Sequence, residues 1–487
     1  MSKIRWYYVW GAFFTLVFFS LLTIRLGIFQ KNHDPMPMVP VTAGERSSES
    51  WMNIYQNNKK IGVSHRTFSV RDKGFSIGEN VSMQINTMGV TQVLNISTNS
   101  DLNTDMTVSS FNFDITSSLF RFNAHGFVVK NRLMLFTGLP GAQQKIEIPL
   151  KEIPRISGNI YDAAFRLSLE KDMTHIFSIF DPSTLSLRSI QVTRHADEII
   201  SIMGKRILAK KYCADFMGAQ NCAWLGNNGD TLKETGILGL SLEKVSPEKA
   251  KEGISKEDKI DFTQVASIPA NVIIDNPQKL SRIKIQIGAV RNIPLHLHGD
   301  RQNFRNDVLT IIREQPSALQ PAGNDIPRDV AVFLQATPLV QANHPDIKAQ
   351  VDKIVDPSDS PEQKAKKIVD WVYRHIEKKP VLSVPNALEV LLNKAGDCNE
   401  HAVLVAAFLR TAGIPAQIES GLVYLSGRFY YHAWNSVYLG KWITADAIFN
   451  QFPTDVTHIR LIRGEANKQL DLIGVMGKIK LEILERQ

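Results

Sequence analysis

The sequence contains few cysteines and no recognisable metal or nucleotide signature. Its 487 residues include only three cysteines, at positions 213, 222 and 398. There is no zinc-type spacing of Cys and His, no phosphate-binding Gly-rich loop and no basic cluster interleaved with aromatic residues. Internal repeats and low-complexity tracts are also missing. We therefore expect no cofactor, no metal and no nucleic-acid partner.

Length and composition are those of an ordinary globular chain. Hydrophobic residues make up 44% of the sequence and charged residues 21%, and the length allows about two to four domains. The net charge of +8 and the pI near 9.2 would favour contact with anionic lipid headgroups or acidic polymers. A well-solvated basic surface is the simpler explanation.

The N-terminus predicts a membrane anchor. Residues 6–24 contain no charge, and at 1.5 Å per residue they nearly cross a hydrocarbon core of about 30 Å. The run is longer than the apolar core of a cleavable signal peptide. We predict a cytoplasmic N-terminus over residues 1–5, a transmembrane helix over 6–28 and a Pro-rich linker over 29–50. The expected location is the inner (cytoplasmic) membrane, single-pass, with the bulk of the chain periplasmic or otherwise extracytoplasmic.

Short strands separated by turns predict a large antiparallel β-rich region over residues 51–320, in one or two subdomains. Stretches such as 53–56, 60–63 and 283–287 are typical. Within this region Cys213 and Cys222 would face each other across a hairpin as a non-hydrogen-bonded pair, which suits a disulfide. Two unrelated core residues in neighbouring strands are the alternative. In either case Cys398 is left as a single thiol.

From about residue 325 the pattern becomes helical. Residues 360–363, Ser-Pro-Glu-Gln, predict a capped helix start. A second helix is predicted to begin at Cys398, where the partial positive charge of the helix N-terminus should lower the pKa of the thiol. His432 lies in a predicted strand and Asp446 in the next one. A thiol, an imidazole and a carboxylate in this order form a candidate acyl-transfer triad.

Several blocks of the C-terminal third resemble the transglutaminase-like superfamily, which is related to papain-type cysteine proteases. The blocks are residues 387–389, 396–402, 410–415, 432–434 and 442–446, and the resemblance covers about residues 325–487. It implies Cys398 as nucleophile, His432 as general base and acid, and Asp446 as the orienting carboxylate. Ala447 departs from the pattern, because many relatives have proline there. The expected fold class is α+β, with an N-terminal transmembrane helix, the β-rich region and a C-terminal transglutaminase-like (papain-like) domain.

The predicted strands constrain the register of the triad. For Asp446 to lie on the same face as His432, a three-residue loop over 439–441, or an equivalent bulge, must pair Trp434 with Asp446. A plain two-residue turn would place the carboxylate on the opposite face. We therefore predict the first register.

Other assignments remain open at this stage. His401 lies one helical turn after Cys398 and could serve as the base. Asp397 and Glu400 could be carboxylate catalysts, although acidic residues in a first turn also complement the helix dipole. Cys398 could be an inert buried thiol. His458 and His375 are expected to be structural or solvated.

The expected function is a membrane-anchored, extracytoplasmic cysteine acyl-transfer enzyme that forms a thioester. Its expected substrates are peptide, protein or peptidoglycan-type amides, with either hydrolysis or transamidation as the outcome. The alternative is a non-catalytic envelope protein that binds a peptide or partner through a cysteine-protease-like domain.

Overall fold

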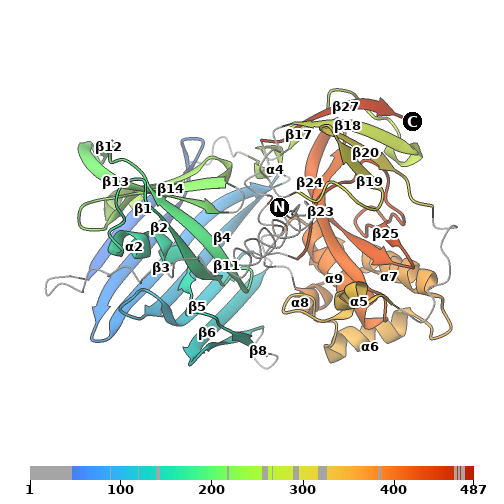
Figure 1. The fold of residues 1–487 in the computed structure, drawn as a ribbon, viewed down its shortest axis with the longest axis horizontal. Coiled ribbons are helices and arrows are strands. Elements are labelled where there is room, and N and C mark those ends of the chain that lie inside the picture. Colours follow the sequence, from blue (N-terminus) through green and yellow to red (C-terminus); the bar gives the residue numbers. More distant parts are fainter. Residues whose placement is uncertain are drawn as a thin grey trace, which may run out of the picture.

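A computed structural model describes residues 47–487 of the chain, with gaps at 88, 119, 139–142, 217–218, 255–260, 266, 289–294, 316–325, 382–383, 385, 466–468, 470–471 and 473–477. The chain forms two lobes that lie side by side (Figure 1). A curved β-sheet, coloured blue to green, makes up the first lobe. Sheets and helices coloured yellow to red make up the second.

The first lobe is one sixteen-stranded sheet in which nearly every strand pairs antiparallel with its neighbour. Its order is β8-β7-β6-β5-β4-β3-β2-β1-β16-β15-β14-β13-β11-β10-β9, with β12 on β13; only β9 and β10 are parallel. The strands are β1 (Ser48–Gln56), β2 (Lys59–Arg71), β3 (Gly74–Thr87), β4 (Val90–Leu102), β5 (Val108–Thr116), β6 (Arg121–Val129), β7 (Arg132–Thr137), β8 (Gln144–Pro149), β9 (Arg155–Ile156), β10 (Thr174–Asp181), β11 (Ser186–Arg194), β12 (Glu198–Ile202), β13 (Lys205–Phe216), β14 (Ala219–Leu225), β15 (Thr231–Thr235) and β16 (Leu240–Val245).

Alternation of apolar and polar residues gives this sheet a packed face. Phe75, Ile77, Phe177 and Ile179 lie in one apolar cluster, which the helix α2 (Ile160–Arg166) covers with its two buried alanines. Cys213 and Cys222 are directly opposite each other in the β13–β14 pair and form a disulfide.

The described residues of the second lobe form three smaller sheets. One has the order β17-β24-β23-β26 with β25 on β24, another the order β19-β20-β18-β27, and β21 pairs with β22. Their strands are β17 (Ile268–Pro269), β18 (Arg282–Gly288), β19 (Gln302–Arg305), β20 (Val308–Ile312), β21 (Glu377–Lys378), β22 (Ala395–Gly396), β23 (Ala416–Leu425), β24 (Arg428–Tyr438), β25 (Trp442–Ala445), β26 (Ile459–Arg463) and β27 (Lys480–Arg486). Strands β17 and β18, which the strand pattern grouped with the β-rich region, pair with β24 and β27 of the second lobe.

The helices of the second lobe lie against the sheet of β23 and β24 (Figure 1). They are α5 (Arg328–Ala331), α6 (Pro345–Ile354), α7 (Pro361–His375), α8 (Ala387–Asn393) and α9 (Cys398–Thr411); α3 (Pro247–Lys251) and α4 (Phe262–Val265) are short helices that precede this lobe. The expected start of α7 is confirmed, because Ser360 and Gln363 form a reciprocal capping box. Helix α9 is buried along most of its length, and residues 402–409 are all inaccessible.

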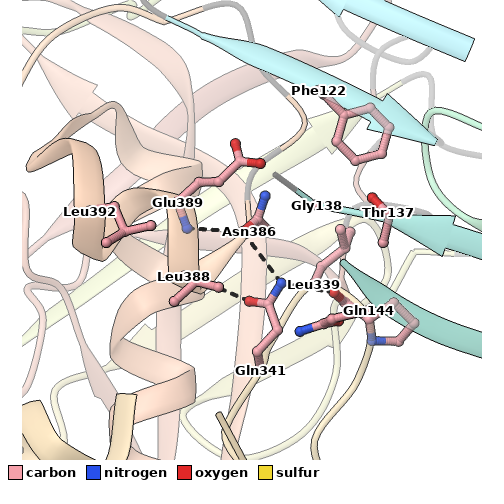
Figure 2. A pocket seen from close by; sticks show the side chains of 11 residues that line it. Phe122, Thr137, Gly138, Gln144, Leu339, Gln341, Asn386, Leu388, Glu389 and Leu392 are labelled. Atoms are coloured by element: carbon pink, nitrogen blue, oxygen red, sulfur yellow. Dashed lines mark hydrogen bonds between the residues drawn. The ribbon is translucent and has the colours of Figure 1, made fainter. Parts of the chain in front are cut away.

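A small cavity marks the junction between the lobes (Figure 2). Phe122 and Thr137 line it from the first lobe, and Leu339, Asn386 and Glu389 from the second. Its volume of about 30 Å³ is room for roughly one water molecule, which is too little for a substrate. Leu339 also packs into the apolar cluster of the first lobe. The cavity is therefore part of an interface that joins the lobes.

Glu389 makes the stability of this junction depend on pH. Its side chain is 6% exposed, and burial raises its pKa to about 7, although Asn386 hydrogen-bonds to it. The folded state therefore binds the proton more tightly than the unfolded state, so the contribution to stability is greatest near pH 4.5 and declines as the pH rises toward 7.

We expect Glu389→Gln to raise the free energy of unfolding at pH 8 by up to about 3 kcal/mol and to change it little at pH 4.5. Urea unfolding at both pH values measures this, with the exposed Glu482→Gln as the matched control. An equal effect of E389Q at both pH values would contradict the ionisation argument.

The structure corrects the expected fold class and location. The described chain is β-rich, and none of its helices is long and apolar enough to cross a membrane. The longest, α7, has 15 residues, about 22 Å at 1.5 Å per residue, and it carries charges on its exposed face. The transmembrane helix expected over 6–28 lies outside the described residues, together with the N-terminus 1–5 and most of the linker 29–50. The structure gives no support for a single-pass inner-membrane protein, and we do not retain that assignment.

Candidate active site

The pairing of β24 with β25 brings His432 and Asp446 together. Asn435 pairs with Ala445 and Tyr438 with Trp442, so the loop between the strands spans three residues, 439–441. Continued by one step, this register sets Trp434 opposite Asp446. The predicted register is thereby confirmed, and it places the carboxylate on the face of the sheet that carries His432.

The imidazole and the carboxylate are hydrogen-bonded in a buried position. Nε2 of His432 lies 2.7 Å from Oδ2 of Asp446, and the two residues are 5% and 1% exposed. The other oxygen, Oδ1, accepts the backbone N–H groups of Ile448 at 2.6 Å and Phe449 at 3.3 Å. Burial alone would raise the pKa of Asp446, but the charge and hydrogen bond of His432, with those of His458, outweigh it and hold the pKa far below its usual value. Asp446 is therefore an ionised, fixed acceptor, and it keeps the proton of neutral His432 on Nε2.

Cys398 begins helix α9, as expected, and is half-buried beside β24. The Asp397 side chain caps the amides of Asn399 and Glu400, which leaves the N–H of Cys398 outside the cap. The backbone N–H of Ala433, next after His432, lies close enough to the thiol to lower its pKa. The thiol itself forms no hydrogen bond with His432 in the described part of the chain.

The electrostatic environment of the thiol differs from the expectation. Burial raises the pKa of Cys398 well above its usual value, the charge of Asp397 adds to this, and Asp446 contributes in the same direction. Burial and the neighbouring Glu400 carboxylate likewise raise the pKa of Asp397. The expected lowering by the helix N-terminus is thus outweighed by desolvation and acidic neighbours. A base is needed to remove the proton from this thiol.

The rival catalytic assignments receive structural roles. Nδ1 of His401 lies 2.7 Å from the backbone oxygen of Asp397, and burial lowers the pKa of His401. Glu400 accepts the backbone N–H of Asp397 at 2.9 Å and completes the second capping box of the lobe. His375 is exposed and bonds to the carbonyl of Trp371. All three residues act in or near helix ends.

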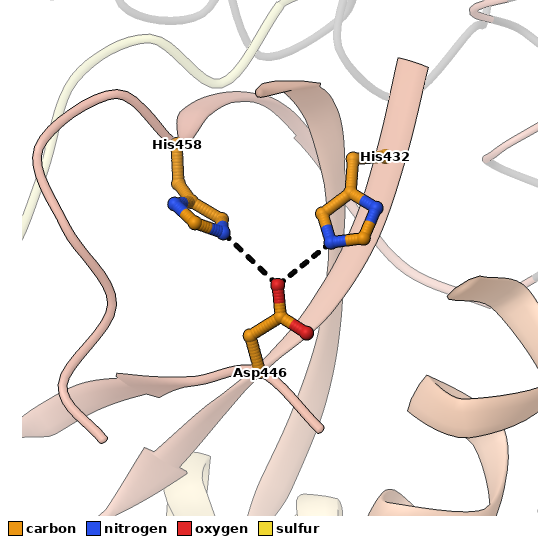
Figure 3. A group of neighbouring side chains, drawn as sticks. All are labelled: His432, Asp446 and His458. Carbon is orange, nitrogen blue, oxygen red and sulfur yellow. Dashed lines mark hydrogen bonds and ion pairs between the residues drawn. The ribbon is translucent and has the colours of Figure 1, made fainter. Parts of the chain in front are cut away.

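His458, which the sequence analysis expected to be structural or solvated, is buried at the carboxylate of the site. It is 0% exposed, and its Nε2 lies 3.0 Å from the same Asp446 oxygen that binds His432 (Figure 3). Its Nδ1 lies 3.4 Å from Oδ1 of Asp455. The only signal for this residue in the sequence is Asp455, three residues before His458, and such a spacing is common in solvated loops.

The same three side chains are of the types that bind metal ions. The ligand atoms of His432, Asp446 and His458 lie within 4.8 Å of one another. Two ligands of one tetrahedral ion with bonds of about 2.0–2.1 Å would lie about 3.3 Å apart. The observed separations of 2.7 and 3.0 Å are shorter and fit N–H···O hydrogen bonds. The arrangement is therefore that of a carboxylate shared by two imidazoles.

Part of the second lobe matches a known family. Residues 348–447 match the profile of the Transglutaminase-like superfamily. This segment is transglutaminase-like. The matched residues span the positions of Cys398, His432 and Asp446. His458, Asp455 and strand β26 lie beyond the matched residues.

Solved structures with partial similarity also exist. A candidate cysteine protease from Cytophaga hutchinsonii is 16% identical over 45% of this chain and 86% of its own, with a TM-score of 0.28. A β-barrel-like protein of unknown function from Brucella abortus is 10% identical over 41% of this chain and 95% of its own, with a TM-score of 0.32. A candidate protease from Parabacteroides distasonis is 9% identical over 77% of this chain and 70% of its own, with a TM-score of 0.19. No curated protein matches the chain.

Proposed function

We propose that the protein is a cysteine acyl-transfer enzyme that acts on peptide or protein amide bonds through a thioester. The observation that carries the proposal is the buried His432–Asp446 hydrogen bond of 2.7 Å, beside the helix start that bears a single free thiol. Because Asp446 holds the Nε2 proton, Nδ1 of His432 remains as the acceptor for the thiol proton.

The chemistry uses only these groups. His432 takes the proton from Cys398, and the thiolate attacks the amide carbonyl. The N–H of Cys398, which the helix cap leaves outside, supports the oxyanion. The tetrahedral intermediate collapses as His432 returns the proton to the departing amine, and a thioester remains. Water then gives hydrolysis, and a second amine gives transamidation.

The proposed substrates are amides of a peptide, a protein or a peptidoglycan-type chain. A hydrogen bond joins the first lobe to a segment that pairs next to the thiol. Gln92 of β4 donates to the carbonyl of Pro380 at 2.8 Å, and the neighbouring Lys379 amide donates to Gly396, two residues before Cys398. In the same hairpin, the amide of Gly89 donates to Asp261 at 2.8 Å. The β3–β4 hairpin therefore contacts the Pro380 segment, which pairs next to the thiol, and this supports a substrate-covering role for the first lobe.

The test is alkylation of Cys398 by iodoacetamide at pH 7, followed by mass spectrometry of the labelled peptide. We expect selective labelling of Cys398 in the wild-type protein, a loss of about 10²–10³-fold in rate in His432→Ala, and no label at this position in Cys398→Ser. His375→Ala is the matched control, because His375 is exposed and its ring, among the described residues, hydrogen-bonds only to the carbonyl of Trp371. Hydrolysis of a fluorogenic casein substrate by the same variants measures turnover.

One observation favours the alternative of a non-catalytic binding module. The Cys398 thiol is half-buried and its pKa is raised, as in an inert core cysteine. If labelling is equally slow in the wild-type protein and in H432A, the imidazole does not activate the thiol and the binding module is the better assignment.

A further inference from the structure

We propose that His458 is a positioning residue of the Cys398 site, which shares Asp446 with His432 and balances the charge of that carboxylate. The inference rests on the proposed function and extends it to residues outside the matched segment 348–447. It adds two residues, His458 and Asp455, to the triad of Cys398, His432 and Asp446.

The geometry carries the first step of the argument. Oδ2 of Asp446 lies 2.7 Å from Nε2 of His432 and 3.0 Å from Nε2 of His458, and Figure 3 shows both rings directed at this one oxygen. An ionised oxygen only accepts, so both Nε2 atoms must carry protons. The rings of the two histidines are 5.7 Å apart. Asp446 is therefore held from two sides and cannot rotate toward either imidazole alone.

The second step concerns the charge of His458. Burial disfavours its protonated form, but hydrogen bonds to Asp446 and Asp455 outweigh burial and raise its pKa. With a carboxylate at each nitrogen, both nitrogens act as donors, as in an imidazolium. The positive charge of His458 then offsets part of the negative charge of Asp446. His432 experiences a weaker field than a lone buried aspartate would produce.

The surroundings of His458 support this fixed position. Asp455 is anchored by Thr457, whose hydroxyl and amide donate to its Oδ1 at 2.6 and 2.8 Å. The Trp434 ring packs edge-on against His458 at 5.3 Å. Among the described residues, His458 contacts the titratable groups Asp446, Asp455 and His432. Arg301 donates to its backbone carbonyl and pairs with Glu314, and Glu419 accepts from the indole N–H of Trp434, whose ring packs on His458.

A change of His458 should therefore move the pH dependence of the thiol. Removal of one positive charge beside Asp446 makes the field at Cys398 and His432 more negative, so protons leave this pair at higher pH. We expect His458→Gln to shift the midpoint of the iodoacetamide alkylation profile, measured from pH 5 to 10, upward by about one unit. The exposed His375→Gln is the matched control, for which no shift is expected.

The outcomes separate this inference from the proposed function. If wild-type Cys398 shows no His432-dependent alkylation, the proposed function fails. If alkylation depends on His432 but H458Q only lowers the rate without moving the midpoint, His458 is merely structural and the inference is overturned. A second measurement uses the intact protein, in case H458Q does not fold. Nitrogen-15 NMR of the imidazoles at pH 7 should show protons on both nitrogens of His458, and a single protonated nitrogen would overturn the inference.

Discussion

Asp446→Asn is expected to lower turnover at pH 7 by about 10³–10⁴-fold while the protein remains folded. Oδ1 of Asp446 accepts two backbone N–H groups, at Ile448 and Phe449. An asparagine would keep its carbonyl there and direct its NH₂ group at the two imidazoles. Two donors would then face each other, so neutral His432 would have to move its proton to Nδ1. In that tautomer it presents an N–H to Cys398 and cannot accept the thiol proton.

Casein hydrolysis and iodoacetamide labelling both measure this loss, and a circular dichroism melt checks the fold. Asp370→Asn is the matched control, because Asp370 forms only an exposed pair with Arg374 on α7. Activity of D446N within about threefold of the wild-type protein would show that the carboxylate does not set the tautomer. The catalytic assignment of all three residues would then have to be abandoned.

The parts of the site that could be predicted from the sequence depend on local rules. The helix start at Ser360 follows from a capping box, and the thiol at the start of α9 follows from an aspartate cap. The β24–β25 register follows from a requirement that two side chains share one face, because a shift of one residue would reverse every side chain. In each case the residues that determine the local structure lie within about fifteen residues of one another.

The parts that could not be predicted depend on how a loop folds back and on contacts between distant segments. His458 reaches Asp446 only because residues 446–458 turn back over the sheet, with Asp446 and Gln451 exchanging backbone hydrogen bonds. Strand β18 pairs with β27 across nearly 200 residues of chain, which no local pattern indicates. The raised pKa of Cys398 arises mainly from burial, which the sequence allowed as an alternative but could not weigh against the helix dipole. Tertiary burial therefore decided the electrostatics of the site.

Arg301 is expected to have the largest effect on stability of any residue behind the site. It is 9% exposed, and its guanidinium donates to the backbone carbonyls of Thr454, Asp455 and His458 at 2.9–3.1 Å. It also pairs with buried Glu314 at 3.0 Å. One side chain from the turn before β19 thus satisfies three carbonyls of the loop that carries Asp455 and His458.

Arg301→Met should therefore lower the free energy of unfolding of the second lobe by about 3–5 kcal/mol, since it leaves a buried carboxylate without its cation. Glu314 would keep only the amide and hydroxyl of Thr444, at 2.9 and 2.8 Å. The double variant R301M/E314Q should recover at least about 1 kcal/mol, because glutamine can still accept from Thr444 and carries no charge. Urea unfolding followed by tryptophan fluorescence measures both variants, with the exposed Arg305→Met as control. If E314Q gave no recovery in the R301M background, the cost would come from the unpaired carbonyls, and the ion pair would not be what holds this loop against the site.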